Sequence, residues 1–172
     1  VGYGEDGFTP NEFDITEALN VDGDNVLTVA CYEYASASWL EDQDFWRLHG
    51  LFRSVELAAQ PRVHVETVQI EADYNPSMAA GTLNATLQLR NANDAATVKA
   101  KLRDANGTVV WESTQCANET ITLNSGALKN IAPWSAEEPT LYELTVLVVG
   151  HDGPLVEKIV QRIGFRTFRI ED

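Results

Sequence analysis

Residues 39–57 combine acidic, amide, guanidinium and aromatic side chains in one short run. The tetrapeptide Glu41-Asp42-Gln43-Asp44 lies between Trp39 and the pair Trp46-Arg47, and Gly50 precedes an apolar, strand-like run that ends at Leu57. Aromatic faces bind sugar rings, and carboxylates and amides exchange hydrogen bonds with sugar hydroxyls. This mixture of residue types therefore predicts a carbohydrate-binding surface.

The acidic run has two further interpretations. Glu41, Asp42 and Asp44 could supply the paired carboxylates of a retaining glycosidase, which lie about 5 Å apart. Acidic loops are also common on the solvated surface of so negative a chain. The residue types alone favour the solvated loop.

Two tryptophan segments invite a similar choice. Trp46 and Arg47 either bind a sugar or lock their loop onto the sheet, and the structural role is favoured because Arg–aromatic pairs are frequent. Trp134, between Pro133 and Pro139, is expected in the core or at a domain interface rather than as a sugar platform.

Other chemistries find no support. His49, His64 and His151 are widely separated and lack a cysteine or second histidine at ligand spacing, so no zinc site is expected. The sequence has no Gly-x-Ser-x-Gly elbow and no glycine-rich phosphate loop. Triad hydrolases and nucleotide-binding proteins are therefore not indicated.

Composition excludes two classes of partner. The 172 residues are 44% hydrophobic with no apolar run long enough to span a bilayer, which predicts one or two globular domains. Twelve basic against twenty-six acidic residues give a net charge of −14. Such a charge repels phosphate backbones and anionic lipids, so neither nucleic acid nor membrane is an expected partner.

The two cysteines and the first residue indicate where in the cell the protein is expected and whether the chain is complete. Cys31 is expected inside an apolar strand and Cys116 in a polar connection, both as free thiols, which favours a reducing, cytoplasmic location. The chain opens on Val1 without an export signal. We expect it to be a piece of a longer protein whose own localisation signal would lie upstream.

The pattern of polarity indicates a mostly antiparallel β protein. Alternation predicts strands at Val26–Tyr32, Leu83–Leu89, Val98–Leu102 and Tyr142–Val148. Turns with positive φ are predicted at Asp22-Gly23, Asn106-Gly107 and Asp152-Gly153. Only Asn11–Leu19 suits a helical turn, with Asp14 or Thr16 as its cap.

Pro61 marks the predicted domain boundary, because proline removes a ladder donor before a new apolar run begins at Val63. Residues 61–172 hold about seven strand candidates, as an immunoglobulin-like β-sandwich requires. Residues 1–60 offer too few strands to bury an apolar face and are expected to be part of a larger sheet domain. Alone, this segment would pack on the sandwich, self-associate or stay partly disordered.

Several segments together resemble a known family. They are Val1-Gly2-Tyr3-Gly4-Glu5-Asp6, Glu12-Phe13-Asp14-Ile15-Thr16, Glu41 to Arg47, Gly50-Leu51-Phe52-Arg53, Pro133 to Tyr142 and Ile163 to Ile170. In residue types, spacing and order this chain resembles the β-galactosidases of glycoside hydrolase family 2, most weakly over residues 72–130.

The resemblance implies a domain order. In that family a galactose-binding-like jelly roll precedes an immunoglobulin-like sandwich and a (β/α)₈ barrel that holds both catalytic glutamates. Residues 1–60 would be the C-terminal part of the jelly roll and residues 61–172 the sandwich. The parent would be a retaining enzyme that hydrolyses terminal non-reducing β-D-galactose, and this fragment alone would be inactive.

The resemblance also assigns one site residue. Asp44 matches the family residue that contacts a sodium ion and galactose hydroxyls, whereas Glu41 and Asp42 are expected to accept backbone hydrogen bonds. The remaining sodium ligands would come from the barrel, which can also hold magnesium. The connection from Val110 to Ile121 is too short to reach a neighbouring subunit's active site, as some tetrameric members do.

Two rival interpretations stay open. Another family 2 specificity, β-glucuronidase or β-mannosidase, would share the sandwich, although the acidic run argues against an anionic glucuronide. A stand-alone carbohydrate-binding or adhesive sandwich would lack catalysis altogether.

Overall fold

The structure is a computed structural model that describes residues 1–6, 9–40 and 50–170. The chain divides into two compact units, Val1–Leu57 and Ala58–Asp172. Among the described residues, no helix is both long and apolar enough to cross a bilayer.

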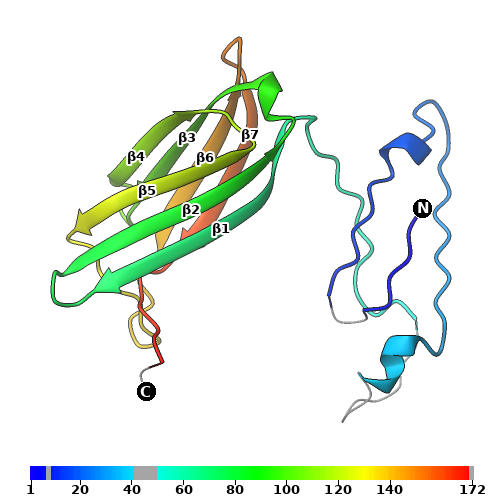
Figure 1. Ribbon diagram of the computed structural model, residues 1–172, viewed down its shortest axis with the longest axis horizontal. Helices are drawn as coiled ribbons and strands as arrows, with labels where there is room; N and C mark the ends of the chain where they lie inside the picture. Colours follow the sequence, from blue (N-terminus) through cyan, green and yellow to red (C-terminus); the bar gives the residue numbers. More distant parts are fainter. Residues whose placement is uncertain (7–8, 41–49, 171–172) are drawn as a thin grey trace. The chain divides into compact units, whose positions relative to one another are not determined.

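The second unit is a two-layered antiparallel β-sandwich (Figure 1). One sheet has the order β1-β2-β5 and the other the order β4-β3-β6-β7. The strands are β1 (His64–Asn75), β2 (Ala80–Arg90), β3 (Ala95–Arg103), β4 (Val109–Cys116), β5 (Thr120–Lys129), β6 (Tyr142–Gly150) and β7 (Leu155–Ile163). Three strands packed on four are typical of immunoglobulin-like sandwiches, which confirms the predicted fold class and strand number.

Alternating burial explains why these segments pair as sheets. Along β6 every second residue is buried, and the same period runs along β2. The inward side chains of both sheets form one core, whose largest fully buried members are Phe165, Leu83, Leu87, Leu102, Leu123, Leu144, Val98, Val146 and Val148. The three strand predictions that fall in this unit are therefore confirmed.

Tyr142 and Phe165 close one end of the sandwich. The Tyr142 hydroxyl accepts a hydrogen bond from the Ala132 backbone N–H at 2.9 Å, which is the tyrosine corner of immunoglobulin-like folds. The two rings meet edge to face, with centroids 5.2 Å apart. A Cβ atom at Gly81 would lie 2.7 Å from Phe165 Cδ1, so only glycine leaves room for this ring.

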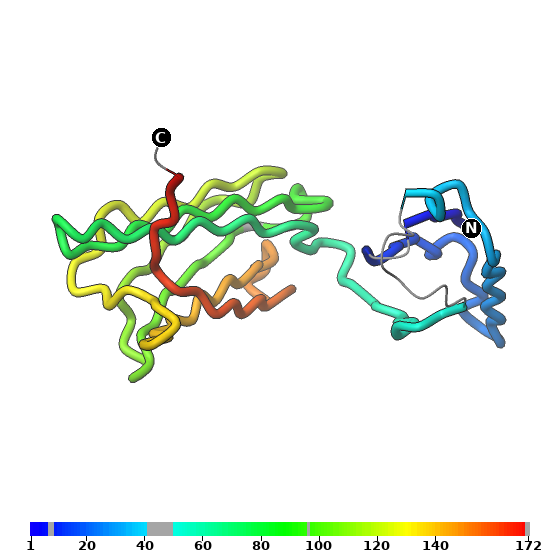
Figure 2. Tube along the Cα trace, turned by 90° about the horizontal axis from the view of Figure 1, so that it is seen from below, coloured from blue at the N-terminus to red at the C-terminus, as the bar shows by residue number. Residues whose placement is uncertain are grey.

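After β7 the chain crosses to the opposite sheet. The Arg166 N–H donates to the Ala72 carbonyl at 3.0 Å, and the Thr167 hydroxyl donates to the Tyr74 carbonyl at 2.6 Å. The terminal segment therefore reaches the edge strand β1, and Figure 2 shows it in red where it crosses the sandwich. These bonds tie the two sheets together beyond the core.

The predicted turns have two different structures. Gly107 and Gly153 adopt φ values of +81° and +85°, which confirms both hairpin turns. Gly23 is not among the glycines with positive φ, so that part of the prediction is wrong. There the Asn25 side chain closes the turn instead, because it accepts from the Asn20 N–H at 2.7 Å and donates to the Asn20 carbonyl at 2.8 Å.

The described part of the first unit contains two 3-10 turns, η1 (Thr16–Ala18) and η2 (Ser36–Trp39), and no strand. The predicted helical turn is confirmed, but the predicted cap is wrong: the N-cap of η1 is Ile15, which makes no side-chain cap hydrogen bond. The Asp14 carboxylate, one residue earlier, accepts from the Thr16 N–H at 2.9 Å. The predicted strand Val26–Tyr32 is wrong, and Val26 is 90% exposed. Alternation produces a strand only where another segment supplies the hydrogen-bonded ladder.

The cysteine environments also differ from expectation. Both Cys31 and Cys116 are free thiols, as predicted, and both are exposed. Cys31 lies in irregular chain rather than a strand, and Cys116 is the last residue of β4 rather than part of a connection. Neither side chain is sequestered in a core.

Val146 tests which face of β6 forms the core. The side chain is 2% exposed, so Val146→Asp should bury an unpaired carboxylate and lower the free energy of unfolding by about 4 kcal/mol or more, measured by urea denaturation. Val160→Asp is the matched control, because Val160 is 46% exposed and should cost about 1 kcal/mol or less. Equal losses in both variants would contradict this assignment of faces.

The sandwich should fold without the first unit, because every buried hydrophobic residue found in the described chain lies between Val63 and Phe165. Deletion of residues 1–60 should leave a monomer with one cooperative thermal transition in calorimetry. If that transition is absent, the sandwich needs contacts from residues before Pro61, which would contradict the predicted domain boundary.

Candidate functional site

The predicted site residue Asp44 lies outside the described residues. The same is true of Glu41, Asp42, Trp46, Arg47 and His49. Their proposed roles in sugar, sodium or backbone binding stay predictions. The structure describes the segments on either side of this run.

The segment before the run is attached to the start of the chain through Glu5. The Ser36 hydroxyl, at the beginning of η2, donates to one carboxylate oxygen of Glu5, and the Tyr3 hydroxyl donates to the other. Ser38 then accepts from the Ala35 N–H at 3.0 Å and holds the turn closed. The Ser36–Glu5 contact thus joins η2 to a residue 31 positions earlier in the sequence.

The same contacts set the charge at this point. The hydrogen bond from Ser36, followed by the one from Tyr3, holds the pKa of Glu5 below its usual range. The hydrogen bond to Glu5 in turn raises the pKa of Tyr3. At neutral pH, Glu5 is therefore an ionised acceptor and Tyr3 a protonated donor, which is the pairing that the geometry requires.

Apolar side chains lie exposed on both sides of the run. Before it, Trp39 is 91% exposed; after it, Phe52 is 67% exposed, with the Arg53 guanidinium carbon 5.4 Å from its ring centroid. Gly50 has φ +101°, a conformation that favours glycine and permits the sharp change of direction after residue 49. These exposed aromatic side chains flank residues 41–49 in the sequence, and the predicted sugar-binding surface stays a prediction.

Trp134 lies at the edge of the sandwich rather than in the core, so the core alternative for this residue is wrong. The backbone N–H of Trp134 donates to the Phe165 carbonyl at 2.8 Å. A Cβ atom at Gly164 would lie 2.7 Å from the Trp134 Cγ, so the ring lies directly against this glycine. The Arg166 guanidinium carbon lies 5.0 Å from the ring centroid. Trp134, Gly164 and Arg166 line a shallow hollow of about 250 Å³.

In the described part of the chain, no group of three His, Cys, Asp or Glu side chains lies close enough together to hold a metal ion. His64 Nδ1 lies 2.8 Å from the Pro61 carbonyl oxygen, and His151 Nε2 lies 3.0 Å from that of Asn93. Both rings therefore have backbone carbonyl partners.

The connection between β4 and β5 is short, as predicted. The segment from Val110 to Ile121 consists mainly of these two strands, joined by residues 117–119. No long loop extends here from the sandwich.

Comparison with known proteins identifies the family. The family model "Glycosyl hydrolases family 2, sugar binding domain" matches residues 1–61, and the model "Glycosyl hydrolases family 2" matches residues 63–166. The chain belongs to glycosyl hydrolase family 2 and comprises a sugar-binding segment and an immunoglobulin-like sandwich.

Its relatives include beta-galactosidases. The chain is 66% identical to Beta-galactosidase BgaC of Bifidobacterium adolescentis, over 100% of this chain and 18% of the relative. It is 47% identical to the Beta-galactosidase of Streptococcus thermophilus, over 100% of this chain and 17% of the relative. The chain thus spans less than a fifth of the length of these relatives.

A solved structure shares the fold. The b-glucuronidase of Ruminococcus gnavus in complex with D-glucuronic acid matches 64% of this chain and 17% of its own, with a TM-score of 0.51 and 21% identity. At this identity the likeness concerns the fold alone.

The Glu5 cluster generates a pH prediction. Because the folded-state pKa of Glu5 is lowered, the cluster should hold above the ordinary glutamate pKa and be lost as pH falls through the lowered value. Ser36→Ala should raise the pKa of Glu5, and Tyr3→Phe should raise it less, in NMR titrations of the side-chain carboxyl carbon.

Ser38→Ala is the matched control, since Ser38 contacts the Ala35 backbone and not Glu5. An unchanged Glu5 midpoint in Ser36→Ala would show that this hydrogen bond does not hold η2 in solution.

Proposed function

We propose that this chain is the non-catalytic portion of a retaining β-galactosidase that hydrolyses terminal non-reducing β-D-galactose. The observation that carries the proposal is identity of 66% and 47%, over the entire chain, to proteins named beta-galactosidase. In this proposal residues 1–60 contribute a loop to the substrate site and residues 61–172 form a spacer. The catalytic barrel and a galactoside are the partners.

Asp44 is the proposed contact to substrate. A carboxylate is a strong acceptor for a sugar hydroxyl and a hard oxygen ligand for an alkali cation, so one residue can serve both. The other sodium ligands would come from the barrel, where magnesium is a further candidate cofactor. Both catalytic carboxylates would lie there too, about 5 Å apart as in retaining enzymes.

The described residues that flank residues 41–49 in the sequence support this role. The Glu5 carboxylate accepts a hydrogen bond from the Ser36 hydroxyl of η2, which precedes residues 41–49 in the sequence. Exposed Trp39 and Phe52 offer apolar surface next to the acidic side chains. An ordered segment before the loop reduces the conformational entropy that is lost when a substrate binds.

The spacer role is supported by the fixed end of the sandwich. Phe165 is fully buried, and Arg166 and Thr167 bond to the edge strand β1. The chain therefore leaves the sandwich from a firmly held position. A domain attached after residue 170 would inherit that direction.

Two alternatives have specific tests. A β-glucuronidase or β-mannosidase would show its own activity in the longer protein, although carboxylates at residues 41–44 would repel a glucuronate anion. A stand-alone carbohydrate-binding or adhesive sandwich would bind glycans through residues 61–172 alone. We also infer a reducing, cytoplasmic compartment, which the exposed free thiols Cys31 and Cys116 support.

The decisive experiment is hydrolysis of a chromogenic β-galactoside by the longer protein at several sodium concentrations. Asp44→Ala should lower kcat/KM by about 100-fold and remove the sodium dependence, because a positioning contact is lost. Asp24→Ala, an exposed acidic residue of the same unit, should leave both unchanged. Full activity of Asp44→Ala would contradict the proposed contact, and no galactosidase activity in the unmodified protein would contradict the proposed reaction.

A further inference from the structure

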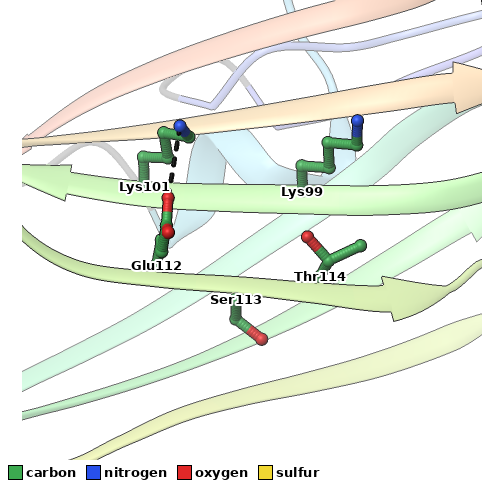
Figure 3. A pocket seen from close by; sticks show the side chains of 5 residues that line it. All are labelled: Lys99, Lys101, Glu112, Ser113 and Thr114. Carbon is green, nitrogen blue, oxygen red and sulfur yellow. Dashed lines mark ion pairs between the residues drawn. The ribbon is translucent and has the colours of Figure 1, made fainter.

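The turn at residues 104–108 joins β3 to β4. The ladder between these strands fixes both ends of the turn, and within it Lys101 pairs with Glu112 at 3.2 Å (Figure 3). At the tip, Asn106 precedes Gly107, which has a φ of +81°. This is the only Asn-Gly pair in the sequence.

An asparagine followed by glycine can lose its side-chain amide without an enzyme. The backbone nitrogen of the glycine attacks the asparagine Cγ, and the amide nitrogen leaves with the displaced proton as ammonia. The product is a five-membered succinimide, which water opens at either carbonyl carbon to give aspartate or isoaspartate. Glycine favours the attack because it has no Cβ atom to obstruct the approach.

Asp104 restrains this attack while the turn is closed. The Gly107 N–H donates to the Asp104 carbonyl at 3.0 Å, so the nitrogen that would attack is already engaged. The Asp104 Oδ1 accepts from the Asn106 N–H at 2.9 Å and from the Thr108 N–H at 2.8 Å. These bonds hold the backbone on both sides of the Asn-Gly peptide bond, and the attack requires a local opening of the turn.

The Asn106 side chain is less restrained than its backbone. Among the described residues it has no hydrogen-bond partner, and its position is exposed to water. Asn124 of β5, which precedes the small residue Ser125, is the opposite case. Its amide nitrogen donates to the Asn84 Oδ1 at 2.5 Å, and its own Oδ1 accepts from the Gly126 N–H at 2.7 Å. The Asn124 amide is therefore held at both ends.

We propose that Asn106 is a site of spontaneous deamidation in this chain and that the closed turn, through Asp104, slows the reaction. Either product alters the turn. Aspartate places a second carboxylate close to Asp104, and isoaspartate lengthens the backbone by a carbon atom between strand ends that the ladder fixes. The inference is independent of the β-galactosidase proposal.

Mass spectrometry after incubation of the 172-residue chain at mildly alkaline pH measures the reaction. Trypsin, which cleaves after Arg103 and Lys129, releases residues 104–129 as one peptide, so Asn106 and Asn124 are compared in the same molecule. Asn106 should convert to a mixture of aspartate and isoaspartate, and Asn124 should keep its amide. An unconverted Asn106, or equal conversion of Asn124, would overturn the proposed site.

Two variants test the role of the closed turn. Asp104→Ala removes the Oδ1 acceptor and should raise the rate constant of deamidation at Asn106 about fivefold. Asp104→Asn is the matched control, because it keeps an Oδ1 acceptor without the charge and should stay within about twofold of the unmodified chain. An unchanged rate in Asp104→Ala, or equal acceleration in both variants, would overturn the proposed restraint.

Discussion

The sandwich depends on how its end is closed by Tyr142 and Phe165. Tyr142 begins β6, holds the preceding connection through Ala132, and meets the fully buried Phe165 edge to face. Phe165 follows β7, the last strand, so its contact with Tyr142 attaches the segment after β7 to the core. Gly81 leaves the space that the ring needs, and any side chain there would force the two sheets to shift.

The closed end also determines how the chain continues. Once Phe165 is inserted, Gly164 lies against Trp134 and the following residues reach β1 on the opposite sheet. Arg166 covers the indole and bonds through its backbone to Ala72. Such a fixed exit suits a domain that holds two others at a set distance, since a flexible tether would not preserve their orientation.

The first unit obeys a different constraint. It lacks a buried core in its described residues and is organised by polar contacts, chiefly those of the Glu5 carboxylate with Tyr3 and Ser36. Exposed polar contacts contribute little stability, because water competes for the same donors and acceptors. The chain spans less than a fifth of the length of its relatives, so this unit is a small part of proteins of that length.

The sequence by itself determined the strand segments of the sandwich, the glycine turns at Gly107 and Gly153, and the family, since these depend on local alternation, backbone freedom and motif order. It failed at Val26–Tyr32, where alternation was present but the described residues supply no ladder partner. Only the tertiary structure decided the Tyr142–Phe165 closure and the contact of Glu5 with Ser36 across 31 positions. A local pattern states which way a side chain points, whereas chain pairing decides what it meets there.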